Sequence, residues 1–194
     1  MAAKHPAGSV RTQLIDAATD LFTRWGVHGT SLQMLADHVG VTKAAVYYHF
    51  QSKEDLIDAA VTPYMRRLAE VVVAAESRRG RTARVDTLLD GLIDLMVDAR
   101  RQQAALQFDP TIQRHLDGRP DMKDLRERVG LLMIGPDLNN HSLVITLILS
   151  GGLAFATGSP YLAHVDDDQL RRDLYTAARR ILGIRTPIAE APRP

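Results

Sequence analysis

Short helical patterns separated by single glycines fill the first fifty residues, and this punctuation constrains the fold more than any other feature. From residue 11 to residue 25 apolar side chains recur at helical spacing, and Gly26 follows where such a helix would end. A second pattern ends at Gly40, which can adopt positive φ at little cost. Residues 42–50 carry the third pattern. The sequence therefore predicts three short helices joined by tight turns.

Polar residues mark the expected starts of these helices. Thr30 and Gln33 have the spacing of a capping box for the second helix, and Thr42 is expected to cap the third. Ser52, followed three residues later by Asp55, marks the start of a fourth helix.

Helical patterns continue along the chain, and strand signals are almost absent. Pro63 interrupts the fourth pattern and predicts a kink or break. Residues 108–119 show no clear pattern, and the proline-containing residues 184–194 are expected to be a disordered tail. The predicted fold is all-α, with eight to nine helices: a three-helix helix-turn-helix domain over residues 1–55 and a helical domain over residues 56–183.

The third helix has the composition of a surface that enters a groove. Ala44 and Ala45 are small and permit close approach, while Lys43 and Tyr47 are long and polar-tipped and can reach phosphates and base edges. Lys53 lies at a helix N-terminus, where backbone N–H groups favour an anion. For any single one of these residues, packing in a helical hairpin remains the alternative.

The string TSLQMLADHVGVTKAAVYYHFQSKEDL, residues 30–56, closely resembles the DNA-binding domain of tetracycline-repressor-type (TetR family) regulators. The preceding helix matches as well, through Leu21, Phe22 and Gly26. Beyond these residues the chain fits the family's ligand-binding and dimerisation domain only in the number and length of its helices. The resemblance implies a ligand-responsive regulator, most often a repressor, that binds a palindromic DNA operator as a homodimer and is released by a small-molecule effector.

The DNA-binding surface can be assigned to individual side chains. The residues expected to contact DNA are Thr30, Gln33, Thr42, Lys43, Ala44, Ala45, Tyr47, Tyr48, His49 and Lys53. Leu35, Val46 and Phe50 are expected to be buried between the helices. Basic and acidic residues are equal in number over residues 1–55, so a positive face depends on where the basic side chains lie, Lys4 included.

The helical body is expected to hold the dimer interface and an effector pocket. The helix over residues 142–157 lacks charge and carries small side chains, and the helix over residues 168–182 offers one apolar stripe. Two copies of each could form a four-helix bundle. A largely apolar pocket is expected to be lined by Met65, Met96, Gln103, Phe108, Met133, His141 and Phe155, although each is more often plain core.

Residues 138–165 carry no charged side chain and are long enough to span a membrane. Polar residues interrupt them, which favours a helix buried in a core or in a subunit interface. The N-terminus lacks the apolar segment of a secretory signal, so a cytoplasmic protein without membrane contact is expected.

Composition and spacing exclude several classes of site. The chain has no cysteine, which excludes disulfides, thiolate metal sites and cysteine nucleophiles. Asp137 with His141, and His164 with Asp168, supply two ligands each, fewer than zinc needs, so no metal or other cofactor is expected. No catalytic motif is present, and the arginines of residues 66–84 are expected to be solvated. A DNA-binding regulator without a small-molecule ligand and an α-helical enzyme remain the alternatives. A closed cavity would favour a ligand-responsive regulator over a regulator without a ligand. Titratable groups converging in that cavity would favour an enzyme.

Overall fold

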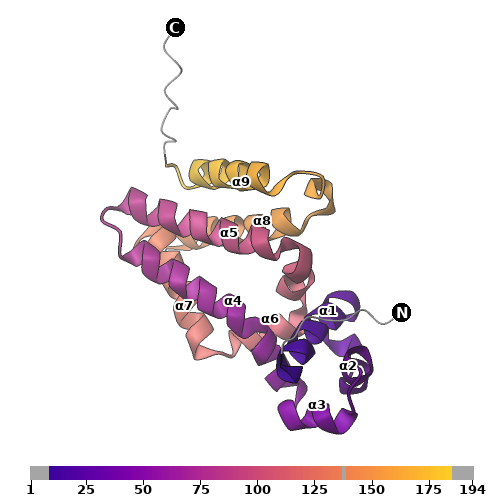
Figure 1. Ribbon diagram of the computed structural model, residues 1–194. Helices are drawn as coiled ribbons and strands as arrows, with labels where there is room; N and C mark the ends of the chain where they lie inside the picture. The colour runs from indigo at the N-terminus through magenta and orange to yellow at the C-terminus, as the bar shows by residue number, and fades with distance from the viewer. Residues whose placement is uncertain (1–8, 137–138, 185–194) are drawn as a thin grey trace. The chain divides into compact units, whose positions relative to one another are not determined.

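The computed structural model describes residues 9–136 and 139–184, without the side chains of residues 101–108 (Figure 1). Lys4, Asp137 and the expected tail beyond Ile184 lie outside the described residues. Within them the fold is all-α, as predicted. The helices are α1 (Val10–Gly29), α2 (Leu32–Val39), α3 (Lys43–His49), α4 (Lys53–Glu76), α5 (Arg81–Phe108), α6 (Pro110–Asp117), α7 (Pro120–Ile134), α8 (Asn140–Gly158), the short 3-10 helix η1 (Pro160–Leu162) and α9 (Asp167–Ile181).

The described chain divides into two compact units. The first contains residues 9–65 and 102–119, and the second contains residues 66–101 and the described residues from 120 onward. The division passes through α4 and α5. The first unit therefore includes the start of α4 and all of α6, in addition to the three helices expected over residues 1–55.

Helices α1, α2 and α3 pack around a small apolar core, confirming the expected burial of Leu35, Val46 and Phe50. The core also takes Leu14, Ala18 and Phe22 from α1. Trp25, which shares the apolar face of α1 by spacing, is instead 62% exposed, at the turn before the helix kinks.

Local capping sets where these helices begin. Ser31 caps α2 by accepting the Met34 N–H at 3.1 Å, so the predicted capping box of Thr30 and Gln33 is wrong by one residue. Thr42 caps α3 as predicted. At the start of α4, Ser52 accepts the Asp55 N–H while the Asp55 carboxylate accepts the Ser52 N–H, a reciprocal capping box.

The structure answers two questions that the sequence left open in the middle of the chain. Helix α4 continues through Pro63, because buried residues on either side, Val61 and Met65, hold it against the protein despite the missing N–H donor. The stretch without a clear pattern contains α6, which Asp109 caps and which has Pro110 in its first turn.

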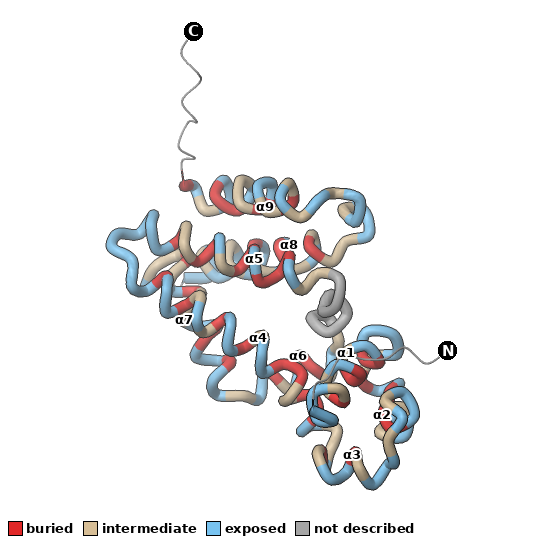
Figure 2. Tube along the Cα trace, in the orientation of Figure 1, coloured by how far each residue is buried: buried red, intermediate tan, exposed pale blue. Residues whose placement is uncertain are grey.

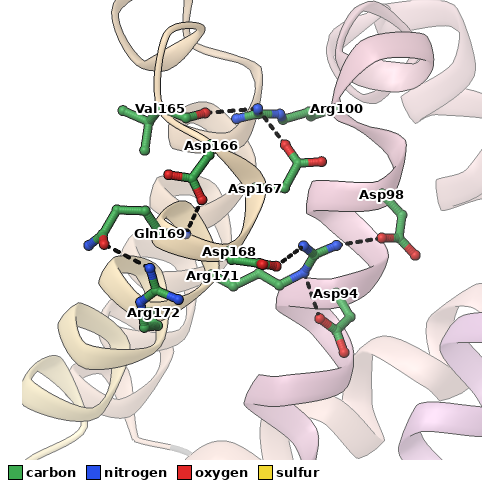
Figure 3. Close-up of polar contacts among 10 residues, drawn as sticks. All are labelled: Asp94, Asp98, Arg100, Val165, Asp166, Asp167, Asp168, Gln169, Arg171 and Arg172. Atoms are coloured by element: carbon green, nitrogen blue, oxygen red, sulfur yellow. Dashed lines mark hydrogen bonds and ion pairs between the residues drawn. The ribbon is translucent and has the colours of Figure 1, made fainter.

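In the second unit a row of carboxylates on α5 faces arginines of α9. Figure 3 shows Arg171 of α9 donating to Asp94 at 2.9 Å and to Asp98 at 2.7 Å. Arg179, whose side chain is 2% exposed, pairs with Asp86. The fourth carboxylate, Asp90, lies in the same row, and desolvation together with the charges of Asp86 and Asp94 raises its pKa. The positive charge of α9 therefore offsets a repulsive row on α5.

Helices α8 and α9 differ in how their apolar faces are used. On α9 the stripe of Leu170, Leu174 and Ala178 is buried within the chain (Figure 2), so these residues do not form the predicted subunit interface. On α8 half of the apolar side chains are exposed, and only 17% of an 18-residue window is buried. Length and mean hydropathy would allow α8 to cross a membrane, but core helices of soluble proteins pass the same test, so this is weak evidence.

Gly91 lets α5 approach α4 closely, and this contact makes a testable prediction. A Cβ added at Gly91 would lie 2.6 Å from Val71 Cγ1, so Gly91→Ala should destabilise the protein by about 1–3 kcal/mol in urea unfolding. The double variant with Val71→Ala should recover much of that loss. Gly130→Ala in α7 is the matched control, because nothing lies within 4 Å of an added Cβ there, and it should be neutral or stabilising. Equal behaviour of the two glycine variants would contradict the packing argument.

Candidate nucleic-acid interface

Helix α3 presents a polar surface that the core does not use. Tyr48 is 84% exposed and Tyr47 is 46% exposed, while Val46 between the helices is fully buried. The Lys43 ammonium lies 5.8 Å from the centre of the Tyr47 ring, a cation–π contact that holds both side chains at the surface. Thr42 and Ala44 are also exposed, and Ala45 and His49 are half-buried.

A hollow of about 380 Å³ adjoins this surface. It brings together five of the predicted DNA-contacting residues from four parts of the first unit. These are Thr30, Gln33, Lys43, Tyr47 and Lys53, joined by His28, Gly29, Ser31 and Leu32. Two ammonium groups and a histidine therefore line one concave surface, which suits an anion.

Two of the predicted contact residues are used inside the protein. Thr30 is 3% exposed and its hydroxyl donates to the Gly26 carbonyl at 2.9 Å, so its side chain ties down the end of α1. Lys53 is half-buried, and its ammonium donates to the Val27 carbonyl at 2.9 Å. Gln33 is exposed but donates to Asp37 at 2.7 Å.

Sequence reasoning missed Asp109, which joins α6 to α1. Gly26 has a φ of 67° and kinks α1, and the Val27 N–H after the kink donates to Asp109 Oδ2 at 2.9 Å. The other oxygen, Oδ1, accepts the Thr111 N–H at 2.8 Å. An Asp before Pro at the start of a helix is a recognisable capping signal, so the cap could have been found in the sequence. The long-range bond could not.

A second polar cluster joins α6 to α4. Asp58 accepts hydrogen bonds from His115 Nε2 at 2.8 Å and from Arg119. Burial by itself raises the pKa of Asp58, but the hydrogen bond and charge of His115 and the charge of Arg119 lower it overall. For Asp109, burial likewise raises the pKa, and the N–H groups of Val27, Thr111 and Ile112 lower it. Both carboxylates are therefore stabilised in their ionised form.

The predicted pocket residues differ in burial and do not all lie in the same unit. Met96 and Met133 are buried in the second unit, and Met65 is buried in the first. Phe155 is 65% exposed and His141 is exposed, so neither fits the predicted apolar lining, because both project from the open face of α8. Gln103 and Phe108 belong to the part of α5 whose side chains lie outside the description. Among the described residues, no group of three His, Asp or Glu side chains could hold a metal ion.

Comparison with known sequences places the strongest similarity over these same helices. Residues 14–60 match the family described as bacterial regulatory proteins, tetR family. The transcriptional repressor KstR2 of Rhodococcus jostii is 30% identical over 104 residues, which are 51% of this chain and 48% of that protein. The regulator AcrR of Shigella flexneri is 43% identical over 53 residues, 27% of this chain and 25% of that protein. The chain thus spans at most about half the length of these relatives.

Solved structures extend the similarity to the whole fold. A TetR-like transcriptional regulator from a Rhodococcus species has a TM-score of 0.69 at 21% identity, covering 92% of this chain and 99% of that one. The ketosteroid transcriptional regulator KstR2 of Mycobacterium tuberculosis has a TM-score of 0.69 at 18% identity, covering 91% of this chain and 95% of that one. At these identities the likeness concerns the fold alone.

The carboxylate of Asp58 predicts a pH dependence of stability. Its pKa in the folded protein is lowered from 3.8, so its stabilising contribution is complete above the unfolded-state value and is lost as the pH falls through the lower folded-state value. We expect the free energy of unfolding to fall as the pH drops below the ordinary aspartate range, and to fall less steeply in Asp58→Asn. Urea unfolding at each pH measures both. Parallel curves for the two proteins would contradict the role assigned to His115 and Arg119.

Proposed function

We propose that this chain, whose residues 14–60 match the family described as bacterial regulatory proteins, tetR family, is a ligand-responsive transcriptional repressor. In this proposal a homodimer binds a palindromic DNA operator in the cytoplasm, and a small-molecule effector releases it. The observation that carries the DNA-binding part is the exposed polar surface of α3, with Tyr47, Tyr48 and Lys43 beside the cationic hollow.

Helix α3 is the proposed recognition helix in the major groove. Ala44 at its start adds little bulk, which permits close approach to base edges, and Tyr48 extends furthest into solvent. Lys43 and Gln33 are positioned for phosphates at the rim of the hollow. Thr30 is left out of the proposed contact set because its side chain is buried.

The proposed dimer surface is a stripe along α8. It consists of two adjacent rows of residues, each with a spacing of four. The first row is Leu143, Leu147, Gly151 and Phe155, and the second is Val144, Ile148 and Gly152. The five apolar side chains are each at least half exposed, and nothing lies within 4 Å of a Cβ built at either glycine. A contiguous apolar stripe of this length marks an interaction surface, and the glycines would let a second α8 approach closely. From α9, only the exposed Ala177 and Ile181 remain available to extend it.

The effector part of the proposal rests on the similarity to tetR-family regulators. Met96 and Met133 are the predicted lining residues that are buried in the second unit, and their flexible side chains suit an irregular apolar ligand. Structures with and without added ligand would test whether a cavity opens beside them.

DNA binding can be tested without knowing the operator. Selection from a random-sequence duplex pool should recover an inverted repeat, because a two-fold dimer reads two half-sites. On the recovered duplex, Tyr47→Phe should weaken binding, and Lys43→Ala should weaken it and lower the slope of log affinity against log salt by about one. Melting temperatures should stay near that of the unmodified protein. Phe50→Ala, by contrast, should lose about 3–5 kcal/mol of stability, because Phe50 is 2% exposed.

Arg66→Ala is the matched control for charge, since Arg66 is an exposed cation of α4 in the second unit. It should leave affinity and salt slope unchanged. If Tyr47→Phe and Lys43→Ala behave like this control, α3 does not meet DNA.

Dimerisation through α8 predicts a clear change in mass. Leu147→Glu places a charge in the middle of the stripe and should give a monomer at micromolar concentration in light scattering, because burying an unpaired carboxylate is strongly unfavourable. Val73→Glu is the control, since Val73 is an apolar residue of α4 that is 56% exposed and lies outside the stripe. It should remain dimeric. A dimeric Leu147→Glu protein would exclude this part of α8 as the interface.

A further inference from the structure

Both polar groups of one backbone residue in α1, Val27, are bound by side chains from outside α1: Asp109, which precedes α6, and Lys53, the first residue of α4. Its N–H donates to Asp109 Oδ2, and its carbonyl accepts from Lys53 Nζ, each at 2.9 Å. The Val27 side chain is 1% exposed. In an uninterrupted helix this N–H would bond to the carbonyl four residues earlier, but the kink at Gly26 redirects it. We call this three-residue arrangement of Asp109, Val27 and Lys53 the Val27 junction.

Asp109 is built closely into the junction. Its Oδ1 accepts the Thr111 and Ile112 N–H groups of α6, at 2.8 and 3.3 Å, which leaves Oδ2 for Val27. A Cβ at Gly26 would lie 3.3 Å from Oδ2, so the carboxylate also approaches the kink itself. One side chain therefore fixes the start of α6 and the end of α1 together.

Lys53 connects the junction to the proposed DNA-binding surface. It is the first residue of α4, three residues after Phe50, the buried residue that follows α3. Its side chain also lines the hollow with Lys43 and Tyr47 of α3 and with His28, the residue after Val27. The junction thus holds the two sides of that hollow, the end of α1 and the start of α4, at a fixed separation.

We propose that Asp109 is a positioning residue for DNA recognition: through Val27 and Lys53 it sets how α3 and the hollow are presented to the duplex. The proposal rests on the proposed function. Asp109 lies 82 residues after Val27 in the chain. The proposal gives it a part in recognising the DNA sequence without a direct contact between its carboxylate and DNA.

Electrostatics makes this proposal sharply testable. Removing an acid from a DNA-binding unit should, by charge alone, tighten binding to every duplex. A loss of positioning should instead weaken binding to the recognised sequence and leave binding to other sequences nearly unchanged, because phosphate contacts tolerate small displacements better than base contacts do. The two effects have opposite signs on the recognised sequence.

The experiment uses Asp109→Ser in the full chain. Serine still caps α6, but its single short hydroxyl cannot also reach Val27. The probes are the duplex recovered by selection with the unmodified protein and a mixed-sequence duplex of equal length, both measured by fluorescence anisotropy. We expect affinity for the selected duplex to fall about tenfold, as full transmission of one lost charged hydrogen bond would give, with little change on the mixed duplex.

Asp20→Ser is the charge-matched control. Asp20 is an exposed acid of α1 in the same unit, and its replacement removes the same charge without touching the junction. Its affinities for both duplexes should stay the same or rise slightly. If Asp109→Ser keeps the unmodified ratio of the two affinities, or tightens both, the proposal is wrong.

Lys53→Met keeps the experiment decisive if Asp109→Ser does not fold. This variant leaves the α6 cap intact and removes the bond to the Val27 carbonyl. If Lys53 has a positioning role, the ratio of the affinity for the selected duplex to the affinity for the mixed-sequence duplex should fall. If Lys53 only contacts phosphate, binding to both duplexes should weaken alike and the ratio should stay unchanged. Failure of the proposed function would show differently, as an unmodified protein that selects no sequence. In that case hydrogen exchange of the Val27 amide decides: unchanged protection in Asp109→Ser overturns the junction itself.

Discussion

The kink that Gly26 introduces into α1 leaves backbone groups that the helix can no longer pair, and the first unit is organised around pairing them. A buried N–H without an acceptor costs about 1–3 kcal/mol, so the Val27 N–H needs a partner from outside α1. Asp109 supplies it, and Lys53 and Thr30 bind the carbonyls beside it. This requirement explains why α6 belongs to the same compact unit as the three N-terminal helices, despite its distance along the chain.

Local features of the fold could be predicted from the sequence because their causes are local. Thr42 and Ser52 cap the helices they precede, and each bond spans only three residues. Thr30 and Ser31 are adjacent residues that can both cap, and burial of Thr30 decides between them. The candidate interface on α3 could also be predicted from the sequence, because a row of polar-tipped residues on a short helix is seldom needed for packing.

What covers the apolar face of each helix could not be predicted in the same way. Periodicity showed that α8 and α9 each carry apolar faces, but not what covers them. The chain itself covers Leu174 of α9, with Arg171 and Arg179 bonded to α5, whereas Leu147 and Phe155 of α8 stay open. The use of Asp109 and Lys53 at Val27 was hidden for a related reason: hydrogen bonds between distant residues leave no spacing in the sequence.

The row of carboxylates on α5 has a consequence for the order in which the protein can be made. Synthesis from the N-terminus delivers Asp86, Asp90, Asp94 and Asp98 long before Arg171 and Arg179 of α9, which offset their repulsion. Arg67 of α4, which is made earlier, can pair with Asp98, but the carboxylates of Asp86 and Asp94 have no arginine partner until the last helix emerges. All residues of the first unit have been synthesised once Arg119 is added. The two units therefore become able to fold at well separated times during translation.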